Sequence, residues 1–158
     1  MSEKWLQKRV PNAVRIGKYK LAVYQLLFHK ASEDGSAKCD AYFTDNPEDI
    51  IIGALFEMNE SERRYLDKVE GLGFGYDEKY VSVISDNGEE VTALIYVATH
   101  IDNNLKPYTW YLNHVVIGAK ETGVSDEYLA SIETTSTIAD PLYQRDLMER
   151  DIYLATQD

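Results

Sequence analysis

The sequence predicts a single soluble α+β domain that spans residues 1–158. Three observations support this prediction. Apolar and polar residues alternate in the first third of the chain, two β-branched segments flank an Asn-Gly pair in the middle, and helical periodicity dominates after residue 109. One domain suits the length of 158 residues, because domains commonly hold about 150 residues.

Strands are expected first along the chain. Residues 13–29 alternate in a broken pattern and predict one or two strands that are interrupted near Gly17. The polar segment 32–36 predicts a turn. Residues 50–58 are β-branched and almost all apolar, which is typical of a strand buried on both faces. We therefore expect residues 50–58 to form a central strand.

A helix and a β-hairpin are predicted next. Asn59 can cap a helix, Glu62 completes a capping-box-like pattern, and Gly71 ends the helical stretch. Residues 80–98 then predict two strands around Asn87-Gly88, because an Asn-Gly pair accepts the positive φ angles of a tight hairpin turn.

Three helices are expected in the last third of the chain. The first covers residues 109–122, with Thr109 as its cap and Gly123 as its end. Ser125, followed by two acidic residues, opens a shorter helix. Asp140-Pro141 is a typical start for a terminal helix.

The charge and the hydropathy pattern argue against several partners. A net charge of −11 opposes binding to nucleic-acid phosphates, so we expect no nucleic-acid partner and interpret the basic residues between positions 4 and 20 as solvated surface. No run approaches 18 apolar residues, and the first twenty residues contain no apolar signal-peptide segment. We expect a cytoplasmic protein without a membrane partner.

Metal and cofactor motifs are not found in the sequence. His29, His100 and His114 lack a metal-ligand spacing and are interpreted as structural. The lone Cys39 suits a reducing compartment and is interpreted as a small apolar filler. We therefore expect neither a metal nor a cofactor.

Glu70 is the main candidate for acid–base chemistry. A carboxylate is unusual at the C-terminal end of a helix, where the carbonyl groups carry partial negative charge. Glu70 also borders the buried stripe of its helix and precedes the glycines Gly71, Gly73 and Gly75. Burial and the helix dipole would both raise its pKa above about 4.3. The alternative is an ordinary surface glutamate beside a flexible loop.

Longer stretches of the chain resemble a known family. Residues 53–58 and 66–71 are similar to the strand, helix and "Leu-Asp…Glu-Gly" segment of the γ-glutamylcyclotransferase-like family. Residues 107–111 and 118–123 resemble its second helix, and residues 9–13 resemble the entry into its next strand. The resemblance therefore covers nearly the whole chain.

The resemblance implies a fold, a reaction and a site. It implies a small mixed β-barrel with helices packed outside, and a general acid/base at Glu70. It also implies substrate-binding residues at Tyr76, Tyr111 and Gly71, whereas without the motif match each tyrosine would be interpreted as an amphipathic core or rim residue. The implied substrate is a γ-glutamyl amino acid or amine, whose own α-amine attacks the γ-carbonyl and releases 5-oxoproline.

One departure from the family pattern affects the expected activity. Family members begin with a strand that leads into a Tyr-Gly-Ser-Asn loop, and this sequence lacks that motif. Met1 falls just after the expected position of the loop, which suggests an internal start and a longer native protein. A missing strand would expose a sheet edge that a homodimer could cover.

Two hypotheses from different classes remain open. The first is a cyclotransferase that uses Glu70 as its acid and base. The second is a non-catalytic module that binds or senses a small molecule on the same fold.

Overall fold

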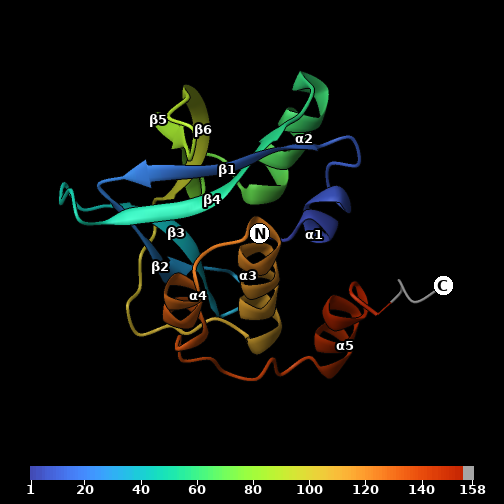
Figure 1. Cartoon of the computed structure of the whole chain (residues 1–158). Coiled ribbons are helices and arrows are strands. Elements are labelled where there is room, and N and C mark those ends of the chain that lie inside the picture. The colour runs from blue at the N-terminus through green and yellow to red at the C-terminus, as the bar shows by residue number, and fades with distance from the viewer. Residues whose placement is uncertain (155–158) are drawn as a thin grey trace.

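The computed structural model describes residues 1–154 and confirms the α+β class (Figure 1). The described residues form six strands and five helices. In chain order these are α1 (Glu3–Gln7), β1 (Val14–Ala22), β2 (Tyr24–Ala31), β3 (Ala37–Phe43), β4 (Ile50–Glu57), α2 (Glu60–Glu70), β5 (Tyr76–Ser85), β6 (Glu90–Ala98), α3 (Thr109–Thr122), α4 (Asp126–Glu133) and α5 (Tyr143–Asp151).

The strands form two antiparallel sheets. One has the strand order β4-β1-β5-β6, and the other is the β2-β3 pair. The prediction of two strands in residues 13–29 is confirmed, but the chain breaks at Val23, whose φ is 63°, and not at Gly17. Gly17 instead lies where the register between β1 and β4 shifts. The left-handed backbone at Val23 directs the chain from one sheet into the other.

Strand β4 is an edge strand, so the prediction of a central strand is wrong. It pairs with β1 alone among the strands of its sheet. Its apolar residues are covered on the other sides by β2 and α3, which both contact β4. The hydroxyl of Tyr128 in α4 accepts a hydrogen bond from the Ile52 backbone N–H at 3.0 Å. Contacts from helices and from the second sheet, and not a second neighbouring strand, explain the apolar composition.

The described sheets do not close into the barrel that the resemblance implies. Strand β3 runs beside β6, but the two strands form no continuous ladder. The carboxylate of Asp40 in β3 accepts a hydrogen bond from the Ala98 backbone N–H in β6 at 2.7 Å. A side chain therefore takes the place of backbone pairing where the two sheets meet, and the sheets stay separate.

The predicted helix ends are partly confirmed. Asn59 caps α2 by accepting from the Glu62 backbone N–H at 2.9 Å, and Gly71 ends the helix with a φ of 73°. The Glu62 side chain does not complete a capping box, because it accepts from Asn12 at 2.9 Å. Thr109 is the first residue of α3 and not its cap. Its hydroxyl group donates to the carbonyl of Ile138, in the linker between α4 and α5, and does not cap the helix.

The sequence pattern predicted some of the remaining elements and missed others. The hairpin of β5 and β6 is confirmed, but of the Asn87-Gly88 pair only Gly88 has a positive φ, 82°, and residues 86–89 separate the two strands. Ser125 caps α4 as predicted. Helix α5 begins at Tyr143, later than the predicted start at Pro141. Helix α1 and strand β3 were not predicted, because α1 is only five residues long and the apolar face of β3 consists mainly of the small residues Ala37, Cys39 and Ala41.

Helix α3 is the centre of the largest hydrophobic core. It contacts α1, α4, α5 and β4, and Figure 1 shows it lying between α4 and α5 below the long strands. The buried core residues around it are Trp5, Tyr108, Trp110, Tyr111, Leu112, Val115, Ala119 and Ile132. Across residues 1–154, none of the helices combines the length and the apolar character needed to cross a membrane.

Candidate active site

A cavity of about 440 Å³ lies where the two sheets meet the helices α1, α2 and α3. Its wall is built from α1, α2, α3 and strands of both sheets. The volume falls in the range of small-molecule sites. Two predicted site tyrosines, Tyr76 and Tyr111, line this cavity together with Glu70.

Glu70 is the last residue of α2, and its side chain is half-buried at the cavity wall. Within residues 1–154, its carboxyl group has no hydrogen-bond or ion-pair partner. Burial raises the pKa of Glu70, while the positive charges of Arg9 and Lys30 oppose part of that shift. The predicted direction of the pKa shift is confirmed. A raised pKa shifts a carboxyl group toward the range in which it can both accept and donate a proton.

Tyr76 and Tyr111 meet at Cys39 of β3. The Tyr76 hydroxyl donates to the Cys39 carbonyl at 2.7 Å. The Tyr111 hydroxyl accepts from the Cys39 backbone N–H at 3.0 Å and donates to the Cys39 Sγ at 3.0 Å. Burial raises the pKa of both tyrosines, so both hydroxyls stay protonated at neutral pH. Three polar groups from three elements are thus fixed at the wall.

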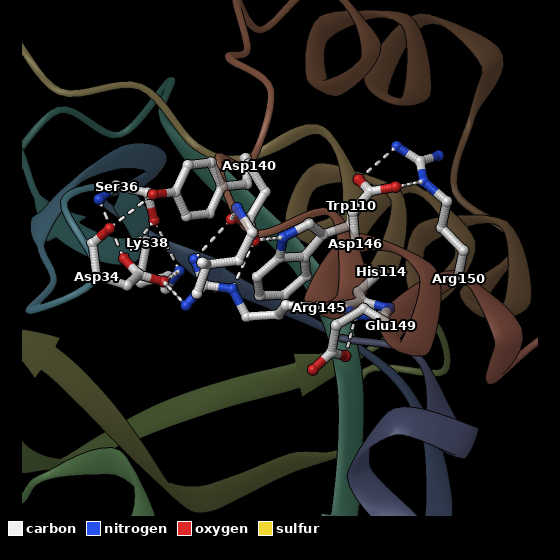
Figure 2. A network of polar contacts seen from close by, with 12 residues as sticks. Asp34, Ser36, Lys38, Trp110, His114, Asp140, Arg145, Asp146, Glu149 and Arg150 are labelled. Atoms are coloured by element: carbon white, nitrogen blue, oxygen red, sulfur yellow. Dashed lines mark hydrogen bonds and ion pairs between the residues drawn. The ribbon is translucent and has the colours of Figure 1, made fainter.

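Two other carboxylates line the cavity, and both are fully engaged. Asp34 accepts from Ser36 through Oδ1 and from Lys38 Nζ through Oδ2 at 2.8 Å (Figure 2). Asp40 accepts from the β6 backbone through Oδ1 and bonds His29 Nε2 through Oδ2 at 2.8 Å. The carboxyl group at the end of α2 is therefore the one acidic group of the described wall without a partner.

The structure also separates Gly71 from the other candidates. Gly71 ends α2 in a left-handed conformation and is not part of the described cavity wall. The wall residues that sequence reasoning did not place in the site include Arg9, Lys30, Lys38 and Cys39. Arg9 follows α1, Lys30 lies on β2, and Lys38 and Cys39 lie on β3. Their spacing in the sequence matches no motif, so only the tertiary structure brings them together. No group of three or more potential metal ligands occurs in residues 1–154.

A comparison with known protein families shows to which family the chain belongs. A family model described as the AIG2-like family matches residues 50–132, more than half of the chain. The chain belongs to the AIG2-like family. The matched segment of this AIG2-like chain runs from β4 through α4 and contains Glu70, Tyr76 and Tyr111. The resemblance to γ-glutamylcyclotransferase-like proteins is confirmed.

Two named proteins are similar to this chain in sequence. A "Gamma-glutamylcyclotransferase" of Bos taurus is 33% identical over 133 residues, which cover 79% of this chain and 70% of that protein. The protein of the same name from Homo sapiens is 33% identical over 84 residues, which cover 52% of this chain and 44% of that protein.

Solved structures confirm the fold of this AIG2-like chain. A structure titled "Gamma-glutamyl cyclotransferase" superimposes with a TM-score of 0.82 at 21% identity, covering 95% of this chain and 92% of that one. The crystal structure of an uncharacterized Homo sapiens protein superimposes with a TM-score of 0.77 at 25% identity, covering 85% of this chain and 82% of that one.

Proposed function

We propose that this protein cleaves γ-glutamyl amides by cyclisation, with Glu70 as the general acid/base. The observation that supports the proposal is that Glu70 is the one carboxyl group of the described cavity wall with no internal partner. The names of the similar proteins support the same reaction class.

The proposed reaction needs no cofactor and no enzyme nucleophile. The substrate α-ammonium first loses one proton to solvent. As its nitrogen attacks the γ-carbonyl carbon and closes the five-membered ring, Glu70 takes a second proton from that nitrogen, which leaves the single N–H of the lactam. The amide bond to the leaving nitrogen breaks, and Glu70 returns the proton to that nitrogen. The products are 5-oxoproline and a free amine. Because the attacking and attacked groups belong to one molecule, the site needs to hold only one substrate, in a bent conformation that brings the amine to the carbonyl.

Tyr76 and Tyr111 are proposed to shape the substrate pocket. Their hydroxyl groups are held by Cys39 on one side of the cavity, while Glu70 approaches from α2. The engaged hydroxyls give the wall a fixed shape, so the tyrosines would orient the substrate through ring contacts. Gly71 is proposed to act only indirectly, by ending α2 directly after Glu70.

The decisive experiment measures 5-oxoproline release from a panel of γ-glutamyl amino acids and γ-glutamyl amines by mass spectrometry. Loss of general acid–base catalysis costs about 10²- to 10⁴-fold in rate, so we expect Glu70→Gln to lower turnover by at least that factor. Glu60→Gln is the matched control, because Glu60 lies on the same helix and pairs with Arg64 in solvent.

Two outcomes would contradict the proposal. Equal turnover by Glu70→Gln and the unaltered protein would remove Glu70 from the chemistry. Binding of γ-glutamyl compounds without any release of 5-oxoproline would instead support a non-catalytic binding module.

A further inference from the structure

Three basic side chains line the cavity, and two of them are held by other groups. Lys38 Nζ donates to the Asp34 carboxylate and to the Ser36 hydroxyl, each at 2.8 Å. The Arg9 guanidinium lies 3.7 Å from the centre of a Trp5 ring and donates to the Trp5 carbonyl at 3.3 Å. These contacts fix the two head groups against the protein.

The third basic side chain, Lys30 of β2, has neither a hydrogen bond nor a counter-charge at its ammonium group among the residues that the structure describes. Across residues 1–154, no carboxylate lies within ion-pairing distance of its ammonium group. Its recorded contact is the ring of Tyr76, whose centre lies 4.8 Å from Lys30 Nζ. Among the charged side chains of the described wall, Lys30 is the cation, and Glu70 the anion, whose head group forms neither a hydrogen bond nor an ion pair with the protein.

The loop after Glu70 is shaped around the Lys30 head group. A Cβ atom added to Gly75 would lie 2.8 Å from Lys30 Nζ and 3.0 Å from Lys30 Cε. Gly75 has no positive φ, so its backbone conformation does not require glycine. Its missing side chain leaves the space that the ammonium group occupies. The loop that begins directly after Glu70 therefore contacts the Lys30 head group through Gly75.

We propose that Lys30 binds the α-carboxylate of the γ-glutamyl substrate. The inference rests on the proposed function. The α-carboxylate and the α-amine are attached to the same carbon, so a cation that holds the first group also places the second. A cavity that presents one free anion and one free cation fits the zwitterionic end of an α-amino acid. Lys30 thus positions the amine for proton transfer to Glu70 and acts as a substrate-binding residue.

The test pairs a change in the protein with a change in the ligand. The substrates are γ-glutamyl-alanine and 4-aminobutyryl-alanine, which lacks the α-carboxylate and closes to 2-pyrrolidinone. We expect the unaltered protein to prefer γ-glutamyl-alanine by about 10- to 100-fold in kcat/KM, the range for hydrogen bonds to charged groups. Lys30→Met should lose this preference, mainly through a higher KM for γ-glutamyl-alanine. Its kcat/KM for 4-aminobutyryl-alanine should stay the same as that of the unaltered protein.

Two further variants make the test specific. Lys106→Met removes the same charge from an exposed lysine outside the cavity wall and should keep the preference. Gly75→Ala should fold, because the atoms that its Cβ displaces are the end of a flexible side chain, and it should lose part of the preference. Lys30→Met that keeps the full preference would overturn the proposal.

A binding measurement separates this inference from the proposed reaction. Titration calorimetry compares 5-oxoproline, which keeps the carboxylate, with 2-pyrrolidinone. Tighter binding of 5-oxoproline that is lost in Lys30→Met supports the carboxylate site even if no turnover is observed, in which case only the proposed reaction fails. Equal binding of 5-oxoproline by both proteins overturns the role of Lys30, and absence of both turnover and binding overturns both proposals.

Discussion

The carboxylate of Asp140 attaches α5 to α3 and allows a quantitative prediction (Figure 2). Its side chain is fully buried and accepts from the indole Nε1 of Trp110 at 2.7 Å, from the Leu142 backbone N–H at 2.8 Å, and from Nε and Nη2 of Arg145 at 2.5 and 2.8 Å. Hydrogen bonds from Arg145 hold the pKa of Asp140 well below its usual range.

The cost of Asp140→Ala follows from the groups left behind. The indole N–H of Trp110 becomes a buried donor without an acceptor, which costs about 1–3 kcal/mol. The Leu142 N–H loses a cap-like bond, which costs about 1 kcal/mol. Arg145 is 27% exposed and regains water, so its loss is smaller. We expect the free energy of unfolding to fall by about 2–4 kcal/mol in total.

Urea unfolding at pH 7, followed by circular dichroism, measures this change. Asp146→Ala is the matched control, because Asp146 also forms two hydrogen bonds with an arginine of α5, Arg150, but in contact with solvent. Exposed pairs contribute at most about 1 kcal/mol. If Asp140→Ala cost no more than Asp146→Ala, the argument from burial would be refuted. Because the pKa of Asp140 is lowered on folding, its contribution should persist at neutral pH and fall only in acid below about pH 4.

Two further predictions concern the cavity wall. Burial raises the pKa of Glu70, so its contribution to stability is lost as the pH rises through that pKa. Glu70→Gln should therefore unfold at higher urea than the unaltered protein at pH 7, and the difference should vanish below about pH 4; an unchanged or lower midpoint at pH 7 would contradict this. Tyr111→Phe removes the acceptor of the Cys39 backbone N–H and should lower the free energy of unfolding by about 1–2 kcal/mol, whereas a change within measurement error would mean that water replaces the hydroxyl.

Local sequence patterns predicted most of the elements with strong end signals. Asn59 and Gly71 bound α2, and Asn87-Gly88 turns the hairpin, because each of these residues has a conformation or a cap bond that depends on its neighbours alone. The position of β4 could not be predicted in this way. An apolar strand beside helices and a second sheet has the same composition as a strand between two others.

The candidate site was predictable only in part. Glu70 carries a local signal, because a carboxylate at a helix end next to a glycine-rich loop is unusual. Lys30 carries none, since its place depends on the approach of β2 to the loop that contains Gly75. Cys39 was interpreted as a filler, yet its backbone organises two tyrosines from distant elements. These roles arise from contacts between residues more than 30 positions apart in sequence.

The hydrogen bond between Tyr128 and the Ile52 N–H has a consequence for self-association. An edge strand rich in isoleucine is a template onto which an extended segment of another molecule can add, as in amyloid growth. The phenol of Tyr128 occupies one of the donors that such a segment would need, and α4 stands in the path of its approach. Helix α4 therefore obstructs the addition of a further strand at this edge of β4, and we expect that destabilising α4 would make such addition easier.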